Sequence, residues 1–127
     1  MNRKKILLVD DSNTILMMEK FILRSGPYEI LTASDGEEGV RKAAEQLPDL
    51  ILLDVIMPKM GGFEACKLLR STRATSEIPI IMVTTRGEAA NVEAGWANGC
   101  TDYVTKPINA IELLAKVRNF LGDEVAQ

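Results

Sequence analysis

The sequence contains no histidine, few aromatic residues and only two cysteines, and each scarcity argues against a class of chemistry. Without histidine the chain carries no phosphohistidine, and it builds no Ser-His-Asp or Cys-His catalytic arrangement. Cys66 and Cys100 form no CxxC pair, so their spacing argues against a structural zinc site and favours two reduced thiols without a role. Any covalent chemistry is left to a carboxylate, a hydroxyl or an amine.

Long apolar runs and dense clusters of positive charge are also missing. After the basic N-terminal residues, the apolar run from Ile6 to Val9 is far too short for a signal peptide or a membrane span. The net charge of −3 and the lack of a run dense in Lys and Arg argue against a nucleic-acid or membrane surface. We therefore expect a cytoplasmic protein whose partners are proteins.

The length and the apolar pattern predict one α/β domain. A chain of 127 residues with 46% hydrophobic and 26% charged residues is long enough for a single aliphatic core. Five short apolar runs alternate with helical patterns, which predicts a doubly wound five-stranded parallel sheet with five helices. The expected strands are Ile6 to Val9, Glu29 to Ala33, Leu50 to Leu53, Ile80 to Val83 and Asp102 to Val104.

Capping and breaking residues separate these segments. They include Ser12 or Asn13 before the first helix, Asp35-Gly36 before the second, Gly61-Gly62 before the third, and Asn109 before the last. Gly87 and Gly99 bound the fourth helix. The punctuation agrees with the strand and helix order that the apolar pattern predicts.

Polar residues follow four of the predicted strands. They are Asp10 and Asp11, Asp54, Thr84, and Lys106. Because the carboxyl ends of parallel strands open into a shared crevice, these side chains should converge there. Three neighbouring carboxylates repel one another unless a cation lies among them, and oxygen ligands of this kind favour Mg²⁺. The set predicts metal-assisted phosphoryl transfer.

Each residue taken alone also has an ordinary structural interpretation. The acidic pair could cap a helix, Asp54 could be a loop acid, Thr84 a β-branched strand residue, and Lys106 a solvated surface lysine. Together they favour Asp54 as a nucleophile that forms an acyl phosphate. Lys106 precedes Pro107, so its extended backbone can aim the ammonium across the crevice toward Asp54. A tight turn there would fit a cis peptide bond, although the sequence leaves open which isomer is present.

Other residues carry weaker expectations. Tyr103 taken alone is a half-exposed strand aromatic, and Trp96 belongs to the core or to a partner surface. The remaining candidates are expected to be packing residues: Met17, Met18, Met57, Met60 and Met82.

From about Lys5 to Leu121 the chain resembles the receiver domain of two-component response regulators. The resemblance rests on the acidic pair after KILLV, on LLDVIMP, on IIMVTT and on DYVTKP. It implies Mg²⁺ ligands at Asp10, Asp11, Asp54 and the backbone carbonyl of Ile56. It also implies that Asp54 is the phosphoacceptor, that Lys106 and Thr84 act on the phosphoryl group, and that Thr84 and Tyr103 form the switch.

The resemblance further implies a flavodoxin-like strand order, 2-1-3-4-5. A histidine kinase or phosphotransfer protein would donate the phosphoryl group. A downstream protein would bind the face formed by the fourth helix, the fifth strand and the fifth helix. Ile56 and Arg86 would flank the site and affect the lifetime of the phosphoryl group. Beyond self-phosphorylation and autodephosphorylation no enzymatic activity is expected, and the chain is either a stand-alone receiver or part of a longer regulator.

Two other functions and one other fold are considered. One is a binding module that never takes a phosphoryl group, which the complete set of acids and lysine argues against. The second is a Mg²⁺-dependent phosphohydrolase of the haloacid dehalogenase type, which needs Asp-x-Asp after its first strand, whereas Asp10 and Asp11 are adjacent. The fold-level alternative is a flavodoxin, but the chain lacks its hydroxyl-rich first loop.

Overall fold

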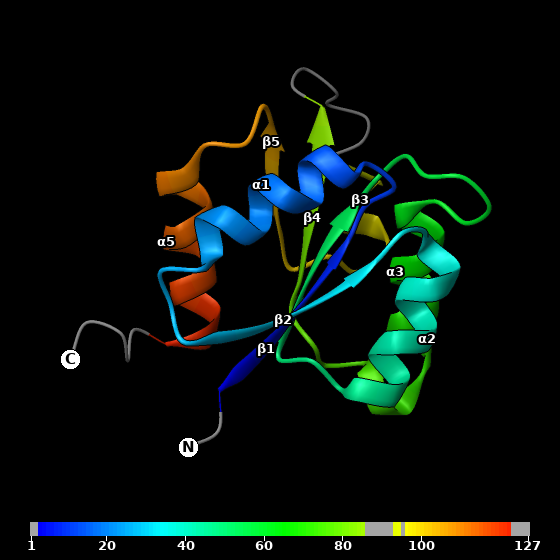
Figure 1. Cartoon of the computed structure of the whole chain (residues 1–127). Coiled ribbons are helices and arrows are strands. Elements are labelled where there is room, and N and C mark those ends of the chain that lie inside the picture. Colours follow the sequence, from blue (N-terminus) through cyan, green and yellow to red (C-terminus); the bar gives the residue numbers. More distant parts are fainter. Residues whose placement is uncertain (1–2, 86–92, 95, 123–127) are drawn as a thin grey trace.

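Strands and helices alternate along the chain (Figure 1). The computed structural model describes residues 3–85, 93–94 and 96–122. Its strands are β1 (Lys4–Val9), β2 (Tyr28–Ala33), β3 (Leu50–Asp54), β4 (Ile80–Thr85) and β5 (Asp102–Lys106). Its helices are α1 (Asn13–Leu23), α2 (Gly36–Gln46), α3 (Gly62–Ser71) and α5 (Ala110–Leu121), with a short 3₁₀ turn at Arg73–Thr75.

All five strands lie in one parallel sheet in the order β2-β1-β3-β4-β5. This confirms the doubly wound fold and the flavodoxin-like strand order. The strands point the same way, so their carboxyl ends meet at one edge of the sheet (Figure 1). The strand order reverses beside β1, and at such a switch point the loops leave a crevice open.

The described part of the chain holds four α-helices where we expected five. The missing one is the fourth helix, expected between Gly87 and Gly99. Most of that segment, like Arg86, lies outside the described residues. The other four helices lie where the sequence pattern predicts them.

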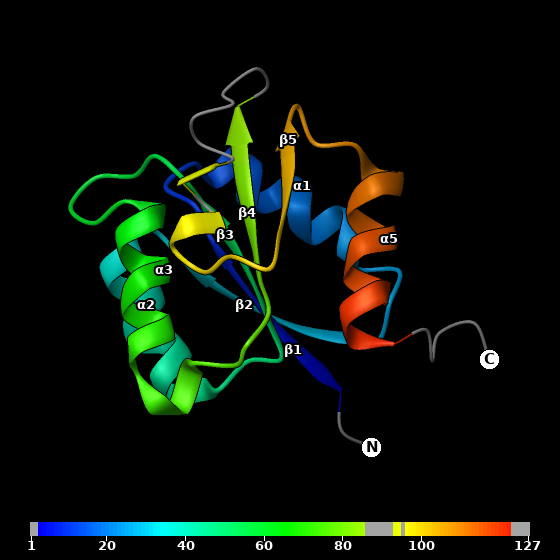
Figure 2. The ribbon, with the colours of Figure 1, turned by 180° about the vertical axis from the view of Figure 1, so that it is seen from behind.

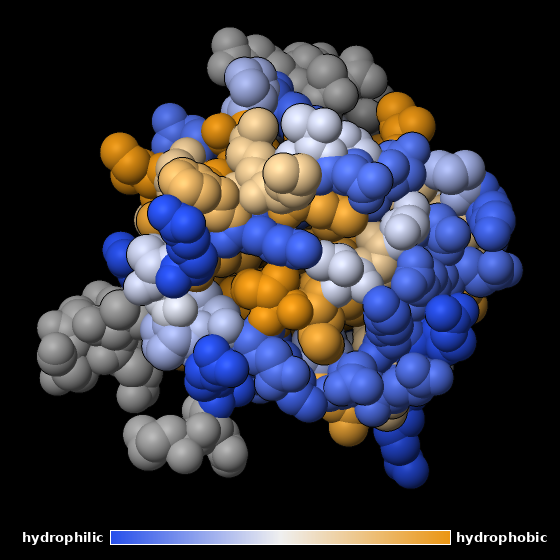
Figure 3. All heavy atoms as spheres, viewed as in Figure 1, coloured by the Kyte–Doolittle hydropathy of each residue, from blue (hydrophilic) through white to orange (hydrophobic). Residues whose placement is uncertain are grey.

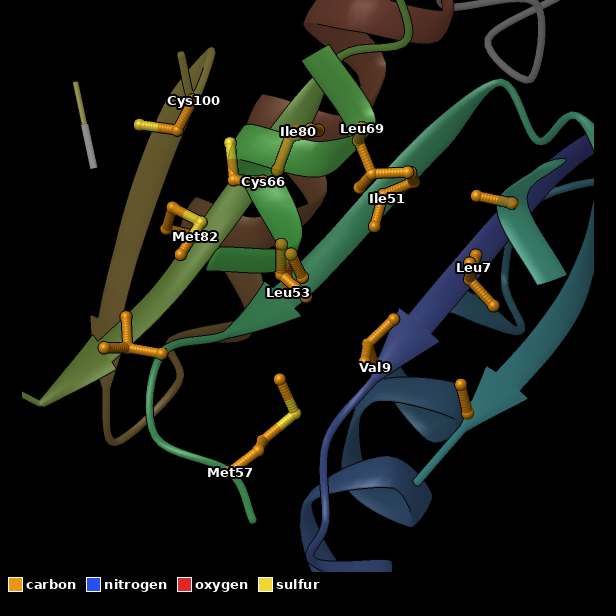
Figure 4. Close-up of a cluster of buried hydrophobic side chains, with 14 residues drawn as sticks. Leu7, Val9, Ile51, Leu53, Met57, Cys66, Leu69, Ile80, Met82 and Cys100 are labelled. Atoms are coloured by element: carbon orange, nitrogen blue, oxygen red, sulfur yellow. The ribbon is translucent and has the colours of Figure 1, made fainter. Parts of the chain in front are cut away.

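Helices cover both faces of the sheet (Figures 1 and 2): α1 and α5 pack on one face, and α2 and α3 on the other. Alternate residues of β1 serve the two faces. Ile6 and Leu8 join the core cluster on the α1 and α5 side, and Leu7 and Val9 join the cluster on the α2 and α3 side (Figure 4). Because both faces are buried, the strands read as continuous apolar runs.

Side-chain caps fix where three helices begin. Ser12 Oγ accepts a hydrogen bond from the Ile15 N–H at the start of α1. Asp35 and Asn109 make the same kind of bond at the starts of α2 and α5. The predicted caps are confirmed, and they place the first residues of each helix next to the strand that precedes it.

The core contains some of the predicted packing residues and not others. Met57 and Met82 are buried and Met60 packs against the same cluster, but Met17 and Met18 are exposed on α1, so their assignment to packing was wrong. Figure 3 shows apolar surface over α1. This helix is apolar on several sides, whereas only the side with Leu16 and Leu23 faces the sheet and α5. No described helix has the length and apolar character needed to cross a bilayer.

Both thiols are free, as expected, and the structure buries them in the cluster under α3 (Figure 4). Burial raises the pKa of the Cys66 thiol, and it raises the pKa of Cys100 to about 11. Their thiolate forms are therefore disfavoured at neutral pH, which fits two thiols without a chemical role.

The backbone of Gly62 lies directly against the end of β3. Its N–H donates to the Val55 carbonyl at 2.7 Å, and a Cβ added here would lie 2.1 Å from the Asp54 carbonyl oxygen. The neighbouring Gly61 has more room, since an added Cβ would come no closer than 3.3 Å to the Val55 oxygen. A tight approach of α3 therefore fixes the backbone around Asp54.

We expect Gly62→Ala to destabilise the protein by about 1–3 kcal/mol, because backbone atoms of Asp54 and Val55 must move to admit the methyl group. Gly61→Ala is the matched control and should change the free energy of unfolding by less than about 1 kcal/mol. Urea denaturation of the two variants measures both effects. Equal stability of the two variants would contradict the prediction.

Glu19 is an acid in the core. It lies on the inward side of α1 between Leu16 and Leu23, and only 1% of it is exposed. Burial raises its pKa to about 8, and the negative charges of Asp10 and Asp54 act in the same direction while Lys106 opposes them. At neutral pH Glu19 is therefore largely protonated.

The stability of the wild-type protein should therefore fall as the pH rises from about 4.5 to about 8. In this window the folded protein keeps the Glu19 proton, which the unfolded chain loses at its ordinary pKa of 4.5. The contribution is fully present below pH 4.5 and absent above pH 8. Glu19→Leu removes this pH-dependent contribution. The free energy of unfolding of the variant minus that of the wild type should therefore be a few kcal/mol larger at pH 9 than at pH 4.5. Denaturation at both pH values tests this, and a pH-independent difference would refute it.

Candidate functional site

The residues that the sequence singled out come together at the carboxyl edge of the sheet. Asp10 follows β1, Asp54 ends β3, Thr84 lies near the end of β4, and Lys106 ends β5. With Asp11 they line a cleft of ≈ 150 Å³, together with Ser12, Val55 and Ile56. This volume has room for a small ion or a phosphoryl group.

Lys106 connects two of the acids. Its Nζ lies 3.1 Å from Asp54 Oδ1, which is a hydrogen bond, and 3.6 Å from Asp10 Oδ2, which is an ion pair without one. The peptide bond from Lys106 to Pro107 is cis. The ammonium reaches from β5 to Asp54 at the end of β3, as predicted, and also to Asp10 after β1, which was not predicted.

The three carboxylates lie close together. One oxygen from each of Asp10, Asp11 and Asp54 is within 4.8 Å of the other two. Asp10 and Asp54 are buried, whereas Asp11 is exposed at the mouth. Two buried acids and one accessible acid around a small space form an oxygen-rich set.

Burial and mutual repulsion act on the two buried acids. Burial raises the pKa of Asp54, the charge of Asp10 raises it further, and Lys106 and the Val55 N–H oppose the rise. Burial also raises the pKa of Asp10, against the Ser12 N–H and Lys106. For Lys106 burial lowers the pKa, but its hydrogen bond to Asp54 and the two negative charges outweigh this, so its pKa is raised. One ammonium does not neutralise three carboxylates.

These residues fit a divalent cation. Asp10 Oδ2 is one of the two buried side-chain oxygens in the described part of the chain that have no hydrogen-bond partner. A buried carboxylate oxygen without a hydrogen-bond partner destabilises the folded protein, and a hard cation bound among the carboxylates would offset this destabilisation. Asp10, Asp11 and Asp54 are therefore the residues that would hold Mg²⁺.

The ordinary interpretations of these residues hold in part. Asp10 Oδ1 accepts a hydrogen bond from the Ser12 N–H, so Asp10 does support the turn into α1 while its other oxygen faces Lys106. Asp54 Oδ1 likewise accepts from the Val55 N–H at 3.0 Å. Lys106 is no solvated surface lysine, because its side chain is only 26% exposed and pairs with both acids. Asp10 and Asp54 therefore each accept a hydrogen bond from the backbone and also line the cleft.

Thr84 and Ile56 differ widely in their exposure to solvent. Thr84 is buried and lines the cleft, whereas the Ile56 side chain is 72% exposed at its mouth. Ser12 also lines the cleft, although the sequence indicated only its cap. Glu19 was missed entirely, and the signal for it was its place three residues after Leu16 and four before Leu23 in the apolar pattern of α1.

Tyr103 is half-buried in β5, on the side of the sheet that carries α2 and α3. Its ring meets the half-exposed Trp96 edge to face, with ring centroids 6.1 Å apart and an angle of 87° between the planes. Because Trp96 is 49% exposed and Tyr103 is partly buried, the pair lies at the surface. Arg86 lies outside the described residues.

Comparison with known proteins shows which family the chain belongs to. The family model for the response regulator receiver domain matches residues 6–118. The alkaline phosphatase synthesis transcriptional regulatory protein PhoP of Bacillus subtilis is 42% identical over 118 residues, which cover 93% of this chain and 48% of that protein. The chain spans about half the length of most of the curated relatives it matches.

Solved structures agree. The chemotaxis protein CheY4 of Vibrio cholerae has a TM-score of 0.87 and 37% identity, covering 94% of this chain and 99% of that one. The receiver domain of the sensor histidine kinase PA1611 from Pseudomonas aeruginosa has a TM-score of 0.88 and 30% identity, covering 96% and 100%, and contains a magnesium ion in its active-site cleft. This chain therefore belongs to the response regulator receiver domain family of two-component signalling.

Proposed function

We propose that this receiver domain accepts a phosphoryl group on Asp54 and changes its partner-binding face in response. The observation that carries the proposal is the position of Asp54. Its carboxylate lies at the bottom of the cleft, hydrogen-bonded to Lys106 on one oxygen and grouped with Asp10 and Asp11. No other carboxylate in the described part of the chain combines an ammonium at 3.1 Å with two further acids in a cleft.

The phosphoryl donor would be a phosphohistidine on a histidine kinase or phosphotransfer protein. Asp54 Oδ1 already accepts hydrogen bonds from Val55 and Lys106, so Oδ2 is the oxygen that we expect to attack. An O–P bond forms at Asp54 as the N–P bond of the donor breaks, and the donor nitrogen leaves with the electron pair. The product is an aspartyl phosphate and a free histidine side chain.

Residues of this chain would stabilise the transfer. Lys106 is an ammonium 3.1 Å from Asp54 Oδ1, the carboxylate oxygen next to the one expected to attack, and it can pair with a phosphoryl oxygen once Asp54 is modified. Asp10, Asp11, Asp54 and the backbone carbonyl of Ile56 would hold Mg²⁺. When bound, this ion supplies positive charge next to the transferring group. The magnesium in the related PA1611 receiver domain supports this assignment.

Thr84 and Tyr103 would convert the modification into a change of surface. The Thr84 hydroxyl, which lines the cleft, can donate to a phosphoryl oxygen and is drawn inward. Tyr103 can then turn into the space that Thr84 vacates, away from Trp96. The face made by the fourth helix, β5 and α5 changes with it, and a downstream protein can bind one of the two forms preferentially.

The proposal also covers the extent of the domain, its location and its partners. We place the function in one domain, with a core from about Lys5 to Leu121, in the cytoplasm. Its chemistry is limited to self-phosphorylation and autodephosphorylation, so the domain acts as a switch and does not turn over a separate substrate. Ile56 and Arg86 would affect how long the phosphoryl group persists by controlling access of water. Protein partners read the output, without contact to nucleic acid through these residues.

Incubation with Mg²⁺ and acetyl phosphate or phosphoramidate should add one labile phosphoryl group, because both donors present a transferable phosphoryl group to Asp54. Intact-mass spectrometry detects the gain. Asp54→Asn removes the nucleophile and should abolish it, while Glu45→Gln, an exposed acid on α2, should leave it unchanged. Absence of the gain with every donor would favour the binding module that works without phosphorylation.

Mg²⁺ should stabilise the folded protein, because binding to the three carboxylates occurs only in the folded state. At a concentration 100 times the Kd the gain is about 2.7 kcal/mol. Asp11→Asn should lose this gain, and without Mg²⁺ it should be slightly more stable than the wild type because one repelling charge is gone. Thermal unfolding with and without Mg²⁺ measures both. An equal Mg²⁺ effect in wild type and Asp11→Asn would refute the assignment of this ligand.

A further inference from the structure

Arg70, in the last turn of α3, donates four hydrogen bonds to segments that lie apart from one another in the structure. Its Nε donates to the Gly99 carbonyl at 2.8 Å, and Nη2 donates to Thr101 Oγ1 at 3.1 Å. Nη1 donates to the carbonyls of Ser76 and Ile78 at 3.1 and 2.7 Å. A planar guanidinium with five N–H donors suits such a set of acceptors. These bonds join α3 to the turn before β4 and to the segment before β5.

The bond to Gly99 continues to the aromatic pair. The Gly99 N–H donates to the Trp96 carbonyl at 3.1 Å, and the Trp96 ring meets Tyr103 edge to face. One turn earlier on α3, the Cys66 thiol donates to the Asn98 carbonyl at 3.2 Å, so two residues of this helix contact the same segment. Figure 2 shows this segment, in yellow before β5, beside α3. Hydrogen bonds thus lead from the guanidinium to the backbone of Trp96.

Side chains hold both ends of the strand that follows. In the described sheet β5 lies at an edge and pairs with β4 alone. At its carboxyl end Lys106 donates to Asp54 in the cleft. Before its amino end Thr101 Oγ1 accepts from Arg70, and it also accepts from the Ile80 N–H of β4. A change of contacts at one end of β5 can therefore move that end while the other stays attached to α3.

We propose that Arg70 is a positioning residue for the aromatic pair: it fixes the segment that carries Trp96 to α3, so that Tyr103 moves against a fixed neighbour when the cleft is phosphorylated. The inference rests on the function proposed above. Phosphorylation changes the partner of Lys106 at one end of β5. The hydrogen bonds of Arg70 lie at the other end and stay in place, so the contact between Trp96 and Tyr103 is the part that opens.

Trp96 is the only tryptophan in the chain, so its fluorescence reports on this segment. Arg70→Gln removes the guanidinium, and the folded variant should emit at longer wavelength than the wild type because the segment releases Trp96 into water. Arg73→Gln makes the same change at an exposed position of the 3₁₀ turn and should keep the wild-type emission. Circular dichroism verifies that both variants are folded. A lower melting temperature of Arg70→Gln with unchanged emission would show a structural role alone and overturn the inference.

Phosphorylation provides the second test. With phosphoramidate and Mg²⁺, the wild-type emission should change because Tyr103 leaves the Trp96 ring. Arg70→Gln should gain the same phosphoryl group by intact mass, but its emission should change less, since the pair is already loosened. Equal emission changes in two proteins that both carry the phosphoryl group would overturn the inference. A wild type that gains no phosphoryl group would instead overturn the proposed function.

A measurement on the wild type avoids substitution altogether. With ¹⁵N labelling, NMR should show that the Arg70 Nε–H exchanges slowly with water, because it donates to the Gly99 carbonyl. On phosphorylation the Tyr103 amide resonance should shift, whereas the resonances of Arg70 Nε–H and the Thr101 amide should shift much less. Shifts of equal size at all of these groups would also overturn the inference.

Discussion

Repulsion among carboxylates at the carboxyl edge of the sheet is the constraint on which the rest of the site depends. Asp10 and Asp54 are buried, and Asp11 stands at the mouth with its oxygen within reach of both. Lys106 compensates part of that charge from β5. The site therefore holds excess negative charge, which favours a cation and, through it, an incoming phosphoryl group. Each role proposed for the acids and for Lys106 is a way of balancing that charge.

The sheet supports this arrangement because the side chains of its central strands are apolar and buried, and the polar side chains follow at the strand ends. Leu50 to Leu53 are buried, with alternate side chains in the two core clusters, so β3 is packed on both faces up to the residue before Asp54. Gly62 then lets α3 approach the end of β3 so closely that the Asp54 backbone has little freedom. The Asp54 carboxylate thereby meets Lys106 at 3.1 Å, although β5 lies two strands away from β3 in the sheet.

The two faces of the sheet place different side chains around the acidic site. On one face of the sheet Glu19 of α1 experiences the charges of Asp10, Asp54 and Lys106 from within an apolar cluster. On the other face Tyr103 packs edge to face with Trp96. The two faces of the sheet therefore differ in character, with an acid in an apolar cluster on one and an aromatic pair on the other.

The sequence by itself determined the succession of strands and helices along the chain, the caps at Ser12, Asp35 and Asn109, and the polar residues that follow the strands. These features depend on local pattern, namely on periodicity and on position at a strand end. Only the tertiary structure decided what neighbours from distant segments impose. It exposed Met17 and Met18, buried Glu19 on the same helix, and left Asp10 Oδ2 without a hydrogen-bond partner. A sequence shows which residues are apolar or charged, whereas burial and the pKa depend on what packs against them.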